Sequence, residues 1–257
     1  MKHVIITGAY GKIGKEIAKG MAKLDCRLFL IGRDSGMLDQ VSREIRSYRP
    51  DCICDPFTAD LSSKQDIFQL ASKIDVPVDV LINNAATAPR LRMETSEGIE
   101  MQWATNVLGY YWMFRAFSEH LLKSENPRVV NVASYWAGGL DLSDPEFKFR
   151  RYNNDQAYRQ SKQADRQLTY GLAEVFKGKI SINACHPGDA NSKLSNDLGF
   201  GGSVSAKEAA KTPLILAATN AGLDNSGAYF EYGAPSRCRF GDDKDQIKHL
   251  LEICDAY

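Results

Sequence analysis

The chain is 257 residues long, and 32 lysines and arginines balance 32 aspartates and glutamates, so its net charge is zero. This balance argues against nucleic acid or an anionic membrane as the main partner and favours a small molecule. No apolar run is long enough to span a membrane and no secretory signal is found, so we expect a cytoplasmic protein. Six cysteines without a CxxC pair are too sparse for a disulfide scaffold and indicate free thiols.

Short apolar runs alternate along the chain with segments of helical period, the pattern of a parallel sheet covered by helices on both faces. We therefore predict one doubly wound α/β domain over residues 1–257, with seven mainly parallel strands and six connecting helices. The predicted strands are 3–7, 27–31, 52–58, 78–82, 128–133, 179–185 and 227–231. The predicted helices are 12–24, 35–48, 63–74, 97–122, 155–176 and 205–220, with a last one at 243–255.

The first predicted strand runs into the glycine-rich stretch TGAYGKIG, which opens the first predicted helix. Gly8 permits a sharp turn and Gly14 permits close packing of helix on strand, while the helix N-terminus offers N–H groups to a pyrophosphate. A tight turn without a ligand is the alternative, but the strand before and the helix after are the context that the motif requires. The predicted cofactor contacts here are Thr7, Gly8, Tyr10, Gly11, Lys12, Ile13 and Gly14.

The second predicted strand ends in LIGRD, where an NAD site would carry a carboxylate that binds the ribose. Gly32 and Arg33 occupy this place, and an arginine can pair with a 2′-phosphate through two N–H groups. The sequence therefore favours NADP(H) over NAD(H), with a solvated surface arginine as the alternative. Lys12 is placed to add charge to the same phosphate or to the pyrophosphate.

Tyr158 and Lys162 are four residues apart in a predicted helix and therefore share one helix face. A lysine ammonium beside a buried phenol would lower the pKa of the phenol and bring proton transfer within reach of neutral pH. As an isolated pair, they are also what an ordinary helix surface would show.

Several further motifs occur in order with this pair, and together they give the chain its resemblance to a known family. They are TADL at 58–61, LINNAA at 81–86, TNVLGYY at 105–111, RVVNVAS at 128–134, AYRQSK at 157–162 and CHPG at 185–188. With the glycine stretch, they resemble the short-chain dehydrogenase/reductase family over nearly the whole length. The long gap between Ser134 and Tyr158 and the SGAYFEY segment resemble its retinol dehydrogenase-like branch.

The resemblance implies a Rossmann-type fold and hydride transfer between NADP(H) and a carbonyl/alcohol pair, with reduction of an aldehyde or ketone as the expected direction. It implies that Tyr158 is the general acid or base, and that Lys162 lowers its pKa and binds the nicotinamide ribose. It implies that Ser134 donates to the oxyanion, and that Asn106 holds a water that links Lys162 to solvent. The further cofactor contacts that it implies are Asp60 with Leu61, Asn83, Asn84, Ala85, Pro187 and Gly188.

The chain departs from the family pattern at three positions. Lys12 stands where the family usually has its second glycine, Ala86 replaces the glycine of NNAG, and Ala133 replaces the first serine of a common pair. The methyl group of Ala86 would narrow the space beside the cofactor. A dinucleotide-binding regulatory or scaffold protein without turnover is the alternative function, although such proteins commonly lack the tyrosine or the lysine and both Tyr158 and Lys162 are present here.

Other features have simpler explanations. The four histidines lack metal-ligand spacing, and Cys52 and Cys54 fit one face of a buried strand, so no metal site is predicted. Cys185 and His186 are neighbours on an extended chain and would point apart, which argues against a nucleophile pair. A homodimer through the aromatic segment 106–117 would be compatible with the family.

Three loops are expected to shape the substrate site, at 86–97, 136–153 and 189–205. The second contains FKFRRY at 147–152, which we interpret as lining of the substrate opening or a solvated face rather than a nucleic-acid site. The third contains GFGGS at 199–203, which suggests a mobile lid.

Overall fold

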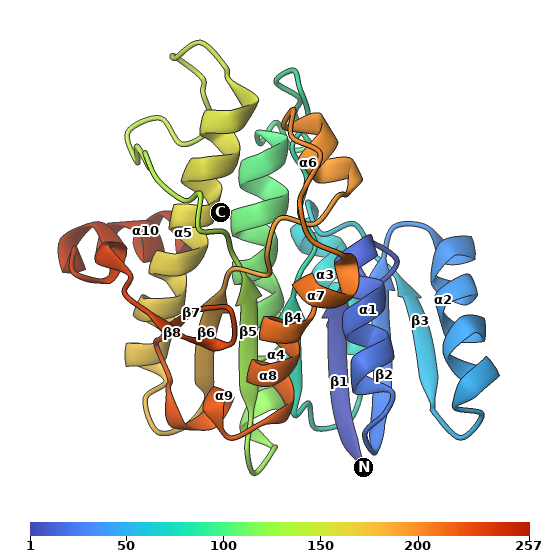
Figure 1. Ribbon diagram of the computed structural model, residues 1–257. Coiled ribbons are helices and arrows are strands. Elements are labelled where there is room, and N and C mark those ends of the chain that lie inside the picture. Colours follow the sequence, from blue (N-terminus) through green and yellow to red (C-terminus); the bar gives the residue numbers. More distant parts are fainter.

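The computed structural model describes residues 1–257 and contains one eight-stranded sheet with helices on both faces (Figure 1). The strand order is β3-β2-β1-β4-β5-β6-β7-β8, and all neighbours are parallel except β7 and β8. The strands are β1 Lys2–Thr7, β2 Cys26–Gly32, β3 Cys54–Thr58, β4 Val80–Asn83, β5 Arg128–Val132, β6 Ser181–Cys185, β7 Tyr229–Glu231 and β8 Ala234–Ser236. The predicted Rossmann-type fold is confirmed.

Alternate side chains of the strands supply two separate cores, as expected for a sheet that is covered on both faces. Ile5 of β1 belongs to a core of 32 buried residues under α3, α4, α5 and α10, while Val4 and Ile6 belong to a core of 24 residues under α1, α2 and α8. The helices of the first layer are α3 Lys64–Ser72, α4 Gly109–Leu122, α5 Asn154–Val175 and α10 Lys244–Ala256. Those of the second are α1 Lys12–Met21, α2 Ser35–Tyr48 and α8 Lys211–Ala218.

Shorter helical segments complete the chain. They are a π-helix at Trp103–Leu108, α6 Lys193–Asp197, α7 Ala206–Ala209, α9 Ala221–Asp224 and a 3-10 turn at Arg239–Gly241. The predicted helix 97–122 is thus a π-helix followed by α4, and the predicted helix 205–220 is divided into α7 and α8. None of the helices combines the length and the apolar character needed to cross a membrane.

The eighth strand corrects the predicted count of seven. Tyr232 and Gly233 both have positive φ, at 50° and 81°, and form a two-residue turn that pairs Glu231 with Ala234. Such turns match the twist of antiparallel strands but usually carry Asn or Gly at the first position. Because position 232 is a tyrosine, the sequence lacks the usual signal for this hairpin.

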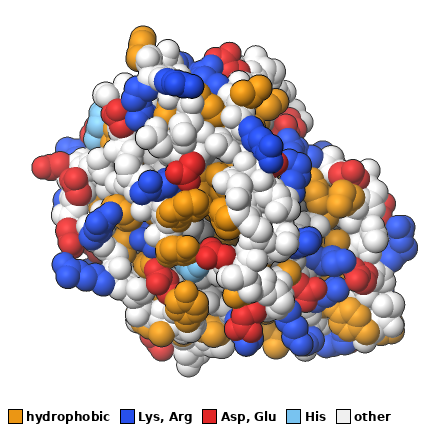
Figure 2. All heavy atoms as spheres, turned by 45° about the horizontal axis from the view of Figure 1, so that its top comes forward, with side chains coloured by type: hydrophobic (Ala, Val, Ile, Leu, Met, Phe, Trp, Pro, Cys, Tyr) orange, Lys and Arg blue, Asp and Glu red, His pale blue; other side chains and the backbone are white.

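The strand order reverses between β1 and β4, and the carboxyl ends of these strands open a crevice there. In doubly wound sheets, ligands bind at such a switch point. Figure 2, which brings the top of Figure 1 forward, shows hydrophobic side chains gathered near the middle of this face and charged side chains around them.

Candidate active site

In the turn between β1 and α1, backbone segments pass so close to one another that glycine is required. Gly8 has φ of +62°, and a Cβ on Gly14 would lie 2.2 Å from the carbonyl oxygen of Gly8. Gly11 precedes the first residue of α1, and no side chain caps the N–H groups of the first turn. Because Gly11, Lys12 and Ile13 line a cleft, these uncapped N–H groups lie where an anion would meet them.

Thr7 and Asn84 brace this turn against the end of β4. The Thr7 hydroxyl accepts the backbone N–H groups of Asn84 and Ala85 at 2.8 and 3.1 Å. The Asn84 amide donates to the Thr7 carbonyl oxygen at 2.9 Å. The predicted turn residue Thr7 therefore holds the two strand ends together, and its side chain does not line the cleft.

The cleft has a volume of about 550 Å³ and brings together most of the predicted cofactor residues. The predicted residues on its wall are Gly8, Tyr10, Gly11, Lys12, Ile13, Gly14, Arg33, Asp60, Leu61, Asn84, Ala85, Tyr158, Lys162 and Pro187. Three others, Thr7, Asn83 and Gly188, are not among them, and Gly188 instead lines a smaller neighbouring pocket.

Asn83 points away from the cleft. Its amide donates to the Asn131 side chain at 3.0 Å and to the Tyr110 carbonyl at 3.4 Å, and it is almost fully buried. Asn84, one residue further along the chain, faces the cleft instead. Residues next to each other in an extended segment point to opposite sides, so the two asparagines cannot share one role.

One end of the cleft carries uncompensated positive charge. Arg33 and Lys12 are exposed on its wall and form no ion pair. The nearest carboxylate in sequence, Asp34, instead accepts the N–H of Met37 at 3.0 Å and caps α2.

The Tyr10 ring lies against Gly32, where a Cβ would come within 2.4 Å of a ring carbon. Asp60, on the same wall, accepts the Ser62 N–H and hydroxyl through Oδ1.

Tyr158 and Ser134 meet where this cleft joins the smaller pocket of about 60 Å³. Tyr158 comes from the first turns of α5, and Ser134 follows β5. Burial raises the pKa of Tyr158 well above its usual range, and the Ser134 hydroxyl opposes this rise. The Tyr158 side chain is therefore a neutral phenol at neutral pH.

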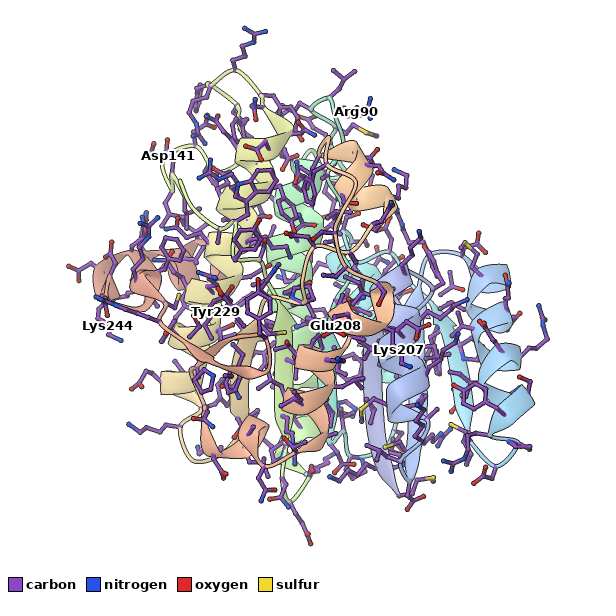
Figure 3. The ribbon with its side chains drawn as sticks, viewed as in Figure 1. Arg90, Asp141, Lys207, Glu208, Tyr229 and Lys244 are labelled. Atoms are coloured by element: carbon purple, nitrogen blue, oxygen red, sulfur yellow. The ribbon has the colours of Figure 1, made fainter.

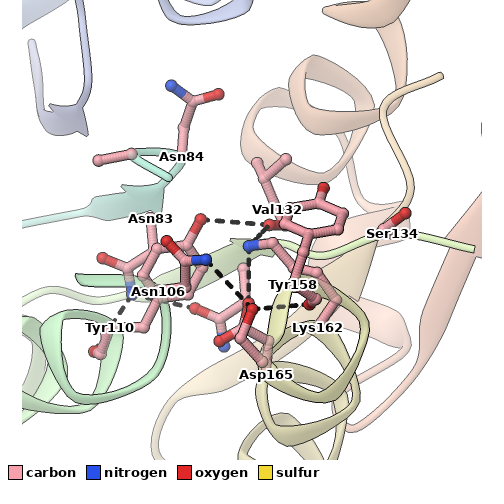
Figure 4. Close-up of polar contacts among 12 residues, drawn as sticks. Asn83, Asn84, Asn106, Tyr110, Val132, Ser134, Tyr158, Lys162 and Asp165 are labelled. Atoms are coloured by element: carbon pink, nitrogen blue, oxygen red, sulfur yellow. Dashed lines mark hydrogen bonds and ion pairs between the residues drawn. The ribbon is translucent and has the colours of Figure 1, made fainter. Parts of the chain in front are cut away.

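Lys162 lies below Tyr158 and is bound to protein groups (Figure 4). Its Nζ donates to the Asp165 carboxylate at 2.8 Å and to the Val132 carbonyl at 3.0 Å. The Nζ atom is 5.9 Å from the centre of the Tyr158 ring. Burial is the main cause of the raised Tyr158 pKa, and the negative charge of Asp165 adds to the rise. The lowering of the Tyr158 pKa by Lys162 stays a prediction.

Asn106 lies in the π-helix, an element that often marks functional sites. Its Oδ1 accepts the Thr87 N–H at 2.9 Å, and its Nδ2 donates to the Thr87 carbonyl and to the Ser161 hydroxyl. The Asn106 side chain thus joins α5 to the loop after β4 and forms no hydrogen bond with Lys162.

The smaller pocket is walled by residues from the loops after β5 and β6. His186, Asp189 and Phe200 line it, and the Tyr135 hydroxyl donates to Asp189 at 3.3 Å. The Tyr135 ring packs edge-on against His186, with ring centres 4.6 Å apart. Burial lowers the pKa of His186, and Asp189 opposes this only in part, so the imidazole is neutral at neutral pH.

Sequence reasoning missed the part of α6 that lines the large cleft. Ser192, Lys193, Leu194 and Asp197 contribute to the wall, although segment 189–205 was expected only as a substrate loop. The short α6 begins at a capping box in which Ser192 accepts the Ser195 N–H and Ser195 Oγ accepts the Ser192 N–H. Serine in place of the usual Glu or Gln at the fourth position weakens the sequence signal of such a box.

The loop 136–153 is irregular, as expected, but its FKFRRY segment does not line either pocket. The Asp144 carboxylate accepts the N–H groups of Lys148, Phe149 and Arg150 and fixes the tip. Phe147 is buried, while Phe149 is 89% exposed. In Figure 3, the label Asp141 lies on this loop and the label Arg90 on the loop 86–97, both at the upper end of the molecule.

The cysteines with possible chemistry are buried. The thiols of Cys52 and Cys54 are both buried and lie 3.7 Å apart, but β3 begins at Cys54, so Cys52 lies just outside the strand that was predicted to hold both. Burial raises the pKa of the Cys185 thiol far above its usual range, which disfavours the nucleophilic thiolate.

A cleft at the switch point, with Tyr158 and Lys162 on its wall and Ser134 in the adjoining small pocket, is the arrangement expected of a nucleotide-binding oxidoreductase. The chain belongs to the short-chain dehydrogenase family, whose model matches residues 2–199. It is 32% identical to human retinol dehydrogenase 13 over 251 residues, which cover 90% of this chain and 76% of that protein. The predicted likeness to retinol dehydrogenases is therefore confirmed.

Two solved structures show how widely the fold is shared. An uncharacterized protein from Mycobacterium paratuberculosis matches with a TM-score of 0.84 and 24% identity, over 100% of this chain and 92% of that one. The Pseudomonas aeruginosa RhlG/NADP complex matches with a TM-score of 0.71 and 25% identity, over 89% of this chain and 93% of that one.

Proposed function

We propose that this protein is an NADP(H)-dependent oxidoreductase that transfers hydride between nicotinamide and a carbonyl/alcohol substrate, with aldehyde or ketone reduction as the main direction. The observation that carries the proposal is the placement of Tyr158 and Ser134 at the junction of the large cleft and the small pocket. A carbonyl oxygen at this junction would lie beside a phenol and within reach of a hydroxyl.

The residues of the large cleft fit a dinucleotide. The uncapped first turn of α1 suits a pyrophosphate, because its N–H groups and helix dipole favour an anion. Arg33 and Lys12 suit the 2′-phosphate of NADP(H), since neither is neutralised by a protein carboxylate. The NADP complex of the Pseudomonas relative supports this choice of cofactor. When bound, NADPH supplies the hydride.

The protein groups then supply the proton and stabilise charge. In the reduction, hydride reaches the carbonyl carbon while the Tyr158 hydroxyl gives its proton to the carbonyl oxygen, and an alcohol is formed. The Ser134 hydroxyl donates a hydrogen bond to the same oxygen as negative charge develops on it. Lys162 stabilises the phenolate that remains until Tyr158 regains a proton from solvent.

The small pocket supports an apolar carbonyl compound as the substrate class. The rings of Trp136 and Phe200 pack edge-on at 5.2 Å and join the two loops that flank the pocket. His186, which is neutral, lines the pocket and packs edge-on against Tyr135. None of the basic residues of segment 147–152 lines either pocket, so an anionic substrate finds little support.

The proposal is tested by NADPH oxidation across a panel of aldehydes and ketones, with NADH in parallel and the Tyr158→Phe protein as the blank. Turnover with NADPH that disappears in the variant supports the proposal. Firm NADPH binding without turnover on any carbonyl would favour a regulatory or scaffold protein instead.

A further inference from the structure

A buried ion pair connects the proposed catalytic residue Lys162 to the carboxylate of Asp165. Asp165 lies one helical turn after Lys162, and the two side chains are 0% and 2% exposed. Their Oδ2 and Nζ atoms are 2.8 Å apart. Lys162 uses a second N–H on the Val132 carbonyl, so one of its three donors is left for the cleft.

The Asp165 carboxylate has no other partner. Its Oδ1 atom is buried and accepts no hydrogen bond. The nearby Thr169 hydroxyl donates to the backbone carbonyl of Asp165 and not to its side chain. A carboxylate in such surroundings keeps its charge only through the cation beside it. Burial raises the pKa of Asp165 to about 7, and Lys162 opposes that rise.

The other ionisable groups around Tyr158 and Lys162 carry less charge or are better screened. Tyr110, whose ring centre is 4.8 Å from Lys162 Nζ, and Cys185 stay neutral because burial raises the pKa of each. Asp189 faces Tyr158 from the loop after β6, but its side chain is about one-third exposed. His186 is neutral. Above its pKa of about 7, Asp165 is therefore the main negative charge within this buried group.

We propose that Asp165 is a positioning residue that fixes Lys162 beneath Tyr158 and cancels part of its charge, so that Tyr158 holds its proton more tightly until a carbonyl oxygen accepts it. This inference rests on the proposed function of Tyr158 as the acid. Without the carboxylate, the ammonium would act on the phenol uncompensated and stabilise the phenolate. The arrangement therefore favours the direction in which Tyr158 gives up a proton, which is carbonyl reduction.

The test is the Asp165→Asn variant, which removes the charge and preserves the shape. Both proteins are labelled with fluorotyrosine, whose ring fluorine lowers the phenol pKa and reports ionisation as a change in chemical shift. The Tyr158 resonance is identified by its loss in Tyr158→Phe. With NADP⁺ bound, we expect Tyr158 to titrate about one pH unit lower in Asp165→Asn, a tenfold change in proton affinity.

Asp79→Asn is the matched control, because Asp79 accepts hydrogen bonds from His3 and Ser124 and does not line the cleft. It should change thermal stability without moving the Tyr158 titration. A titration that is unchanged or moves to higher pH in Asp165→Asn would overturn the inference, as would the absence of ionisation in both proteins over the range in which they stay folded.

A second readout separates this inference from the proposed function. In an active enzyme, the pH profile of kcat/KM should move in the same direction as the fluorine titration, whereas a merely structural role would scale activity equally at all pH values. If the wild-type protein turns over no carbonyl, the proposed function fails, and the fluorine titration still decides the role of Asp165.

Discussion

The adjacent side chains of Arg33 and Asp34 have different surroundings: Arg33 lines the cleft, and Asp34 caps a helix. Asp34 caps α2 by accepting the Met37 N–H at 3.0 Å, and Arg33 is left exposed on the cleft wall without an ionic partner. In the proposed complex with NADP(H), the free Arg33 guanidinium would be the group that meets the 2′-phosphate, and Asp34 would not be available to bind a ribose hydroxyl.

Replacement of Arg33 by alanine should therefore weaken NADPH binding far more than NADH binding. We expect a loss of about tenfold or more in NADPH affinity, or about 1.4 kcal/mol, because a charge-assisted hydrogen bond is lost. Fluorescence titration with both cofactors measures the change. Equal losses for the two cofactors would show that Arg33 does not bind the 2′-phosphate.

Gly14→Ala should disrupt the cofactor turn. The added methyl would lie 2.2 Å from the Gly8 carbonyl oxygen and 2.8 Å from the Asn84 amide, so the turn must shift. We expect a lower Tm and a loss of NADPH affinity. Gly36→Ala in α2 is the control, because its nearest neighbour is 3.4 Å away, and a helical alanine there should stabilise by about 0.5–1 kcal/mol. Normal NADPH binding by Gly14→Ala would contradict the assignment of this turn.

The stability of the protein should fall as the pH drops below about 6.5, in part because of His186. Burial lowers the pKa of His186 in the folded state, whereas the unfolded chain has an imidazole with a pKa near 6.5. The unfolded state therefore binds the proton first, and the stabilisation present above the unfolded pKa is lost as the pH falls toward the folded one. Tm measured between about pH 7 and 5 should fall less steeply in His186→Gln than in the wild type. Parallel curves would exclude this contribution.

Asp144→Ala should loosen the tip of the loop 136–153. Three backbone N–H groups lose their acceptor at once, and the interaction with the Arg150 side chain is also lost. Limited proteolysis should cut within 144–153 faster than in the wild type. Ser143→Ala is the control, since its hydroxyl bonds only to Asp141. Equal cleavage of both variants would mean that Asp144 does not fix the tip.

Much of the fold is predictable because its signals are local. The predicted strand, glycine turn and helix at residues 3–24 are found as β1 and α1, with the helix ending at Met21, and Tyr158 and Lys162 both lie on α5 as predicted. Each of these predictions depends on one element and its periodicity. The hairpin at Tyr232 is not predictable in this way, because a non-glycine residue takes a positive φ there.

The roles of several polar residues depend instead on tertiary packing. Asn83 and Asn84 are alike in sequence, and only the direction of β4 decides that one joins the core and the other the cleft. From the sequence alone, Asp165 would be expected on the solvated face of its helix, because aspartates are seldom fully buried. Its burial follows from the packing of α5 between the sheet and α10, which periodicity does not encode.

The central claim is that hydride passes from NADPH to a carbonyl carbon beside Tyr158. The most direct measurement is the transfer of deuterium from NADPH labelled at the reactive carbon of the nicotinamide, followed by mass spectrometry of the product alcohol. We predict one deuterium on the former carbonyl carbon with the wild-type protein and none with Tyr158→Phe. Tight binding of the labelled cofactor without deuterated product from any aldehyde or ketone would contradict the account.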